Sequence, residues 1–405
     1  MITKKGNVYY VVYKYKTLNG EWKKKWERAG TSRREAEKLE RKLMAERDEG
    51  TPVATRNSMP TLSAFFHQFL ETCIKPPLRA LGTYENYRKC FKRIEPQIGN
   101  VRLDKLTPMH FSVAYKELAK DKYSATSIRM THRVLRAALN KACQWQLLQT
   151  NPIRYADLPK QTPSPARALE RKEFISLLKW SETRPIQDRV FLSLGLLCGL
   201  RIAEICGLRW QDWEEDTHRL YIRHNLVVHD MNGIDKSLYE FVYPRGKKFL
   251  VLGDVKTDSS RDFIIPPDYV IEILGEAKKY YAEQKKIFRQ SYRDFGFILH
   301  DGTGTPCTPD NLTHSFQNII KAHNRDCPDV QIPHIRVHDM RHTAATMLLE
   351  ENVNIKYVSR QLRHSSVSTT QNIYQHVTER MSSVSAKTMD NILSGVEAGV
   401  ERNKK

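Results

Sequence analysis

Two stretches in the second half of the sequence carry an arginine in a setting that could serve chemistry. Arg201 lies in the string Cys-Gly-Leu-Arg-Ile-Ala-Glu, and Arg341 lies in the string His-Asp-Met-Arg-His-Thr. A guanidinium group is planar, always protonated and shaped to bind two phosphate oxygens at once. His338 lies three residues before Arg341 and so shares a face with it at the start of a predicted helix, where an anion is favoured. An isolated His-x-x-Arg is a weak signal, but the longer string is much more specific.

Two further stretches stand out, and the first of them could supply a proton donor. Lys256 lies at the tip of a predicted β-turn, where a mobile ammonium group could protonate a leaving oxygen. An exposed loop lysine is the plain alternative, and Lys247 and Lys248 are rival positions. His364 precedes Tyr374 by ten residues, and taken alone this pair could be a core histidine and a packed aromatic side chain.

Glu204 lies one helical turn after Arg201 and is a candidate partner for it, because a desolvated arginine needs an acceptor. A plain intrahelical ion pair would explain the same spacing.

The order of these residues resembles the tyrosine recombinase family, also called the phage integrase family. The matching order is Arg201, Lys256, His338-x-x-Arg341, His364 and Tyr374. The resemblance implies that Tyr374 attacks a DNA phosphodiester, forms a 3′-phosphotyrosyl bond and releases a 5′-hydroxyl, without ATP, cofactor or metal. It also implies that the two arginines bind the phosphate and that the two histidines hydrogen-bond the phosphate or help to take the tyrosine proton. Lys256 would protonate the leaving oxygen, and Glu204 would orient an active-site group.

One position departs from the family pattern. The family usually has Leu-Gly-His-Ser, but Arg363 replaces the glycine here. Glycine permits a positive φ or a close approach of the backbone. Arg363 could therefore alter the loop that places His364, or it could add a phosphate contact.

The composition favours a DNA-binding protein. The 405 residues carry a formal net charge of +20, and a surface this basic attracts nucleic acid first and anionic membrane second. The seven cysteines form no CxxC pair, which argues against disulfides and a zinc site. No apolar run approaches the ~20 residues that cross a bilayer. A cytoplasmic, nucleoid-associated bacterial protein is expected.

Residues 1–55 are predicted to form an arm-type DNA-binding domain. Strands at 8–15 and 22–26 flank an Asn19-Gly20 turn, and a helix capped at Thr31-Ser32 follows. The second strand carries three lysines between two tryptophans, and the candidate DNA contacts are Lys23, Lys24 and Lys25. A solvated face of the sheet would give the same pattern.

Residues 60–155 are predicted to form a helical, SAM-like core-binding domain. Its helices are expected to begin near Thr61, Thr83, Thr107-Pro108 and Ser124. The last helix, to about Leu147, carries a stripe of basic residues at i, i+4 and i+7 that could lie along phosphates: Arg129, Arg133 and Arg136. Ordinary solvated arginines would give the same pattern.

A proline-rich linker is predicted to lead to a catalytic domain at 166–385 with mixed α/β structure. A tail at 386–405 follows, with Met389, Ile392, Leu393, Val396 and Val400 at helical spacing. This amphipathic helix could pack within its own chain or on a neighbouring subunit. The expected fold class is multidomain, mainly α with small β-sheets (α+β).

The resemblance implies an integrase that integrates and excises a mobile element. The implied partners are double-stranded DNA at core and arm sites, three further copies of the chain in a tetramer, and an excisionase or a host DNA-bending protein. A type IB topoisomerase shares the chemistry but would relax supercoils without pairing sites. A non-catalytic DNA-binding protein on the same scaffold would lack one of the catalytic residue types, and no specific feature supports membrane binding.

Overall fold

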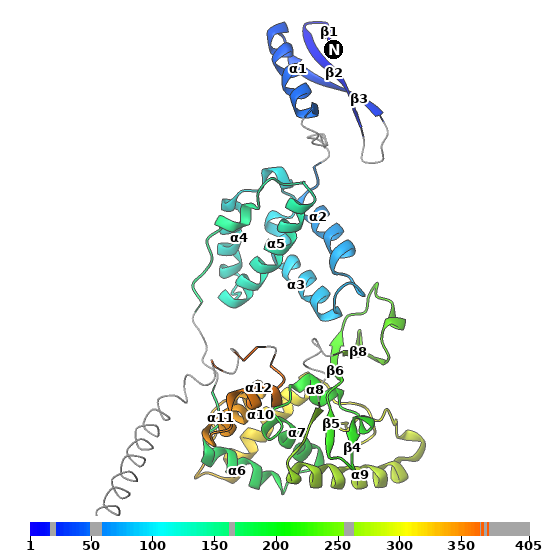
Figure 1. Ribbon diagram of the computed structural model, residues 1–405, viewed down its shortest axis with the longest axis vertical. Helices are drawn as coiled ribbons and strands as arrows, with labels where there is room; N and C mark the ends of the chain where they lie inside the picture. The colour runs from blue at the N-terminus through cyan, green and yellow to red at the C-terminus, as the bar shows by residue number, and fades with distance from the viewer. Residues whose placement is uncertain are drawn as a thin grey trace, which may run out of the picture. The chain divides into compact units, whose positions relative to one another are not determined.

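The chain divides into two compact units, Met1–Thr162 and Pro163–Lys405 (Figure 1). The structure, a computed structural model, describes residues 1–16, 22–48, 59–161, 167–254 and 263–364, together with residues 366, 367 and 371. Four predicted features lie outside the described residues: the Asn19-Gly20 turn, Lys256, Tyr374 and the tail at 386–405.

The first unit begins with a three-stranded antiparallel sheet and one helix. The sheet order is β1–β2–β3, and its elements are β1 (Ile2–Lys5), β2 (Val8–Lys16), β3 (Trp22–Gly30) and the helix α1 (Arg33–Asp48). Alternate residues of a strand face one side, so Val11 and Tyr13 of β2 pack together with Ala36 of α1 in a small core. The hydroxyl of Ser32 accepts a hydrogen bond from the N–H of Arg34, as the predicted helix cap requires.

The rest of the first unit is helical. Its elements are α2 (Leu62–Phe69), a π-helical turn (Leu70–Ile74), α3 (Leu81–Ile98), a 3₁₀ turn (Leu103–Lys105), α4 (Pro108–Lys120), α5 (Ala125–Gln144) and a second 3₁₀ turn (Pro152–Tyr155). The predicted caps Thr61, Thr107 and Ser124 precede α2, α4 and α5.

Two predicted helix limits in this region were wrong. Helix α3 begins at Leu81, two residues before the predicted Thr83, because its N-cap is Ala80, which offers no side-chain oxygen to mark the start. Helix α5 ends at Gln144 and not near Leu147, because Gln146 adopts a positive φ of 59° that no helix can continue.

In the second unit, helices surround a buried central helix. Residues 190–196 of α7 are all buried, which agrees with their apolar character on every side. The helices are α6 (Arg171–Ser181), α7 (Ile186–Leu196), α8 (Ile202–Gly207), α9 (Asp268–Phe288), α10 (Pro309–Asp326), α11 (Val337–Glu350) and α12 (Ile355–Gln361) (Figure 1).

The strands of the second unit form two separate antiparallel sheets. One has the order β4–β5–β9, from β4 (Trp213–Glu214), β5 (Arg219–Tyr221) and β9 (Phe263–Ile264). The other has the order β6–β8–β7, from β6 (His224–His229), β7 (Val242–Arg245) and β8 (Lys248–Asp254). A turn lies at Asn232-Gly233, and Gly233 has a φ of 71°.

The predicted fold class is confirmed, since the described chain is mostly helical with small antiparallel sheets. Within the described part of the chain, none of the helices combines the length and the apolar character that crossing a bilayer requires.

Candidate active site

Arg201 and Glu204 lie at the start of α8 and form an ion pair with each other. Arg201 is the N-cap of this helix, and its N–H donates to Glu204 Oε2 at 2.9 Å, while its Nη1 lies 2.7 Å from Glu204 Oε1. The Arg201 side chain is 37% exposed, whereas that of Glu204 is 4% exposed. The carboxylate is therefore buried behind an arginine that still faces solvent, and the predicted pairing of these two residues is confirmed.

The loop that carries His364 begins with a Schellman cap at the end of α12. The N–H of Arg363 donates to Arg360 O at 2.8 Å, and the N–H of His364 donates to Ser359 O at 3.0 Å. In this motif the residue after the C-cap takes a left-handed conformation, which glycine adopts most easily. Arg363 has a φ of 53°, so it occupies the position that suits the family's glycine and preserves the turn that places His364.

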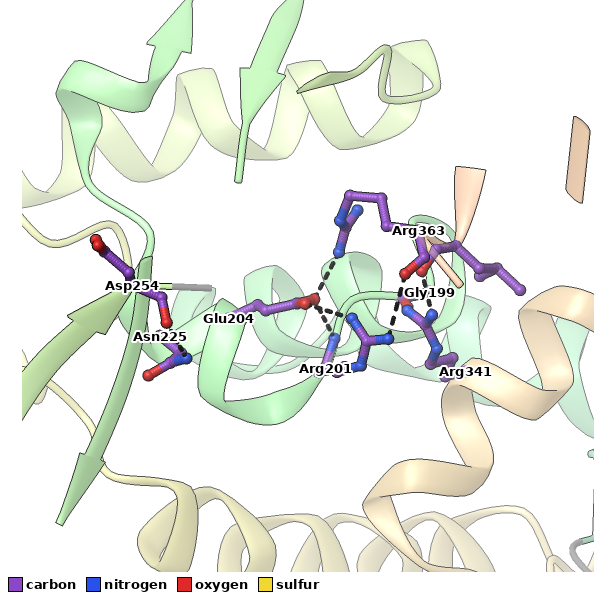
Figure 2. Close-up of polar contacts among 8 residues, drawn as sticks. Gly199, Arg201, Glu204, Asn225, Asp254, Arg341 and Arg363 are labelled. Carbon is purple, nitrogen blue, oxygen red and sulfur yellow. Dashed lines mark hydrogen bonds and ion pairs between the residues drawn. The ribbon is translucent and has the colours of Figure 1, made fainter. Parts of the chain in front are cut away.

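The Arg363 side chain points inward, where its Nη2 lies 2.5 Å from Glu204 Oε2 (Figure 2). Only 1% of this side chain is exposed. Of the two roles predicted for Arg363, the structure places its guanidinium in a buried ion pair and not on the surface, where it could meet a phosphate.

Arg341 joins this loop to the chain just before Arg201. It projects from α11, and its Nη1 donates to Gly199 O at 2.7 Å while its Nη2 donates to Leu362 O (Figure 2). The backbone at Gly199 lies so close to Leu362 that a Cβ added at Gly199 would clash with Leu362 Cδ2. Gly199 also has a φ of 64°. Both observations explain why a glycine precedes the Leu-Arg string.

Electrostatic interactions connect the four predicted arginine and histidine residues. Burial, followed by the positive charges of Arg341 and Arg201, lowers the pKa of His364 to about 4. Burial first and then His342, Arg341 and Arg201 also lower the pKa of His338. The structure therefore brings Arg201, His338, Arg341 and His364 into one positively charged site, and both histidines are neutral at pH 7.

His342 belongs to the same site although no role was predicted for it. Its ring packs edge-to-face against that of His338, with 5.0 Å between the ring centroids. Burial is the main cause of the lowered pKa of His342. The only signal in the sequence is its place in the His-Asp-Met-Arg-His string.

Arg341 and Glu204, the two buried charged groups of the site, both stay ionised at neutral pH. Burial and then the like charge of Arg201 lower the pKa of Arg341 to about 9. Burial raises the pKa of Glu204, but Arg363 and then Arg201 outweigh it, so that the pKa lies below its ordinary value. One carboxylate is thus shared by two guanidinium groups.

Strand β6, which pairs with the strand that leads to Lys256, packs beside α8. A Cβ added at Gly207 of α8 would meet His224 O of β6 at 2.9 Å, and His224 pairs with Asp254, the last residue of β8. Asn225 Nδ2 also donates to Asp254 O at 3.0 Å (Figure 2). The rivals Lys247 and Lys248 lie at the other end of β8, about 20 Å along the strand. Lys256 and Tyr374 themselves lie outside the described residues.

The predicted DNA-binding residues have different surroundings in the first unit. Arg133 and Arg136 are exposed on α5, but Arg129 is half-buried and its Nε donates to Pro159 O at 2.9 Å. On β3, Lys24 is exposed, whereas Lys25 is half-buried and lies 3.4 Å from Glu27. Because successive strand residues face opposite sides, Lys24 faces away from Lys25, so these two lysines do not share one surface.

Metal ligands are not grouped in the described part of the chain. Among those residues, no three His, Cys, Asp or Glu side chains are placed to hold a metal ion.

The lowered histidine pKa values predict a pH effect on stability. The pKa values of His364 and His300 are about 4, below the ordinary value of ~6.5, mainly because of burial. The unfolded chain therefore binds more protons between about pH 6.5 and 4, and the free energy of unfolding falls as the pH decreases through this window. We expect a lower melting temperature at pH 5 than at pH 7.5, and a smaller difference in His364→Gln. An unchanged difference in the variant would contradict the lowered pKa of His364.

Three family models match the chain. The model of the Phage integrase family matches residues 167–381, which include every predicted catalytic position. A model of the Phage integrase N-terminal SAM-like domain matches residues 61–119, and a model of the Arm DNA-binding domain matches residues 1–46.

Curated relatives align with most of the chain. The ICEBs1 integrase of Bacillus subtilis is 24% identical over 377 residues, which cover 90% of this chain and 91% of that protein. A XerC-like tyrosine recombinase of Caldanaerobacter subterraneus is 24% identical over 323 residues, which cover 77% of this chain and 76% of that protein.

Solved structures share the fold. The Tn1549 transposon integrase, in complex with transposon right end DNA, has a TM-score of 0.64 at 19% identity and covers 78% of this chain and 94% of its own. A lambda integrase tetramer bound to a Holliday junction has a TM-score of 0.54 at 16% identity, with 91% of this chain and 92% of that chain covered. The first family model alone spans more than half of the sequence, and the chain belongs to the phage integrase family of tyrosine recombinases.

Proposed function

We propose that this protein binds double-stranded DNA, cleaves it through Tyr374 and rejoins it to a second site, and so integrates and excises a mobile element. The observation that carries the proposal is the joining of Arg201 and Arg341 at the loop that presents His364. Three segments far apart in the sequence meet there around the positive charges of Arg201 and Arg341.

Arg201 and Arg341 would bind the non-bridging oxygens of the scissile phosphate. A guanidinium has five N–H donors, and Arg341 uses two of them on the carbonyls of Gly199 and Leu362. These bonds fix the group before DNA arrives, so little reorganisation is needed as negative charge grows in the pentacoordinate transition state. Such fixed cations stabilise the transition state more than the ground state.

His338 and His364 would bind the phosphate or accept the tyrosine proton. Their lowered pKa values keep both rings neutral at pH 7, and a neutral imidazole has one donor and one acceptor nitrogen. Lys256 would protonate the leaving 5′-oxygen from the segment that follows β8. Attack by Tyr374 would store the bond energy in a 3′-phosphotyrosyl link, so that rejoining needs no ATP.

The domains outside the active site would hold the DNA. We divide the whole chain into an arm-type domain at 1–55, a core-binding domain at 60–155, a catalytic domain at 166–385 and a tail at 386–405. Exposed Arg133 and Arg136 on α5 are the best placed of the predicted phosphate contacts, and Lys24 is the best placed on β3. Arm and core sites would then be bound by different domains of one protomer.

Recombination would take place in a tetramer on DNA. The lambda integrase structure is a tetramer on a Holliday junction, and this chain shares its fold. The amphipathic tail at 386–405 is the segment we assign to contacts between subunits. An excisionase or a host DNA-bending protein would set the direction, and the reaction would occur at the bacterial nucleoid in the cytoplasm.

A strand-exchange assay tests this function. Two DNA fragments taken from the sequences that flank the gene would be incubated with the protein in EDTA and without ATP. We expect recombinant fragments, because the bond energy is stored in the protein–DNA link. A supercoiled plasmid without these sequences should stay supercoiled.

Other outcomes would identify the alternatives. Relaxation of any plasmid without recombinant products would indicate a type IB topoisomerase. Binding of the flanking DNA without cleavage or exchange would indicate a non-catalytic DNA-binding protein.

A further inference from the structure

Arg363 forms part of a closed network of polar contacts with Arg201 and Glu204. The Arg363 guanidinium lies 2.5 Å from one carboxylate oxygen of Glu204, and that of Arg201 lies 2.7 Å from the other. Arg201 Nη2 also donates to the backbone carbonyl of Arg363 at 3.3 Å. The side chain and the backbone of one residue thus connect the His364 loop to the helix that begins with Arg201 (Figure 2).

A purely stabilising role is a poor explanation for this arrangement. Arg363 is almost fully buried, and its Nε and Nη1 have no hydrogen-bond partner among the described residues. Unpaired buried donors and desolvated charges cost free energy, and a buried ion pair is weak evidence of stability. Arg363 also holds a left-handed backbone conformation that glycine would adopt without strain.

The charge of Glu204 suggests what Arg363 provides. Without Arg363, Arg201 would be the one cation within ion-pair distance of the buried carboxylate among the described residues, and the two charges would largely cancel. With Arg363 present, its buried guanidinium neutralises the charge of Glu204, and the positive charge of the partly exposed Arg201 remains available to a ligand.

We propose that Arg363 is a positioning residue that neutralises Glu204, so that Arg201 keeps its net charge for the scissile phosphate, and that ties the His364 loop to α8. This inference rests on the proposed function, because it assumes that a phosphate binds beside Arg201. It gives the departure from glycine at this position a role in the reaction.

A set of variants tests the proposal by single-turnover cleavage of nicked DNA at saturating protein. We expect Arg363→Gly to cleave about tenfold or more slowly, as loss of one electrostatic contact to a phosphate site does, with DNA affinity little changed. Glu204→Gln added to Arg363→Gly removes the uncompensated charge, so the double variant should recover most of the rate. This recovery is a readout that a merely structural role would not give.

Two more variants separate charge from bulk. Arg363→Lys keeps the charge and Arg363→Met keeps much of the volume, so the lysine variant should cleave faster than the methionine variant. Melting temperatures would be measured for all variants, so that rates are compared only between folded proteins.

The outcomes distinguish this proposal from the proposed function. If the wild type forms no covalent adduct, both fail together. If the wild type cleaves and Arg363→Gly cleaves equally fast, or if Glu204→Gln does not restore the rate, only the role of Arg363 is overturned.

Discussion

Replacing Arg341 with alanine should lower the rate of strand cleavage by roughly a hundredfold to a thousandfold, the loss seen when one preorganised donor to a transition-state oxyanion is removed. The same change should destabilise the second unit, because the buried carbonyls of Gly199 and Leu362 lose their hydrogen-bond donor. Each unpaired buried group costs about 1–3 kcal/mol. The rate would be measured in a single turnover on nicked DNA, at a temperature where the variant is folded.

Arg341→Lys separates these two effects. Lysine keeps a positive charge but cannot span two carbonyls and a phosphate with one planar group, so cleavage should stay low. Arg325→Ala is a matched control, since Arg325 is an exposed arginine of the same unit that pairs only with the neighbouring Asp326 among the contacts seen. Cleavage by Arg341→Ala at the rate of this control would contradict the assignment of Arg341 to the phosphate.

The sequence predicted those parts of the site that depend on local spacing. Arg201 and Glu204 are three residues apart at a helix start, and they pair as expected. The helix start with a side-chain cap at Ser124 was placed correctly, whereas α3 begins at Leu81 after Ala80, which gives no such cap, and was placed too late. Local signals therefore predicted local structure.

Contacts between distant segments could not be predicted. The ion pair between Arg363 and Glu204 joins residues 159 positions apart, and no local pattern around either residue predicts it. The substitution at the family's glycine position raised the question of a changed loop, but the left-handed turn is kept because the Schellman hydrogen bonds of α12 impose it. Only the folded chain shows where the guanidinium goes.

The predicted basic stripe illustrates a different limit. Periodicity places Arg129, Arg133 and Arg136 on one side of α5, but it cannot tell which of them is used inside the unit. Arg129 donates to the carbonyl of Pro159, in the segment that follows the helical region, and is half-buried. Only Arg133 and Arg136 remain exposed for a phosphate.

Tyr374→Phe should abolish cleavage while DNA binding remains. Phenylalanine keeps the ring but lacks the oxygen that would form the phosphotyrosyl bond, so no other step can replace it. The expected loss is larger than that for Arg341→Ala, because the arginine stabilises a transition state whereas the tyrosine is a reactant. Gel-shift affinity should stay within a few-fold of the wild type, since the arginines and histidines of the site are unchanged.

The most direct measurement is a covalent-trapping assay with mapping of the attachment site. Wild type and Tyr374→Phe would be incubated with nicked suicide substrates from the flanking DNA and separated on a denaturing gel. We predict a slow, protease-sensitive band with the wild type only, and a DNA-linked peptide that contains Tyr374 by mass spectrometry. An adduct formed by Tyr374→Phe, or DNA linked to any other residue, would contradict the proposed nucleophile.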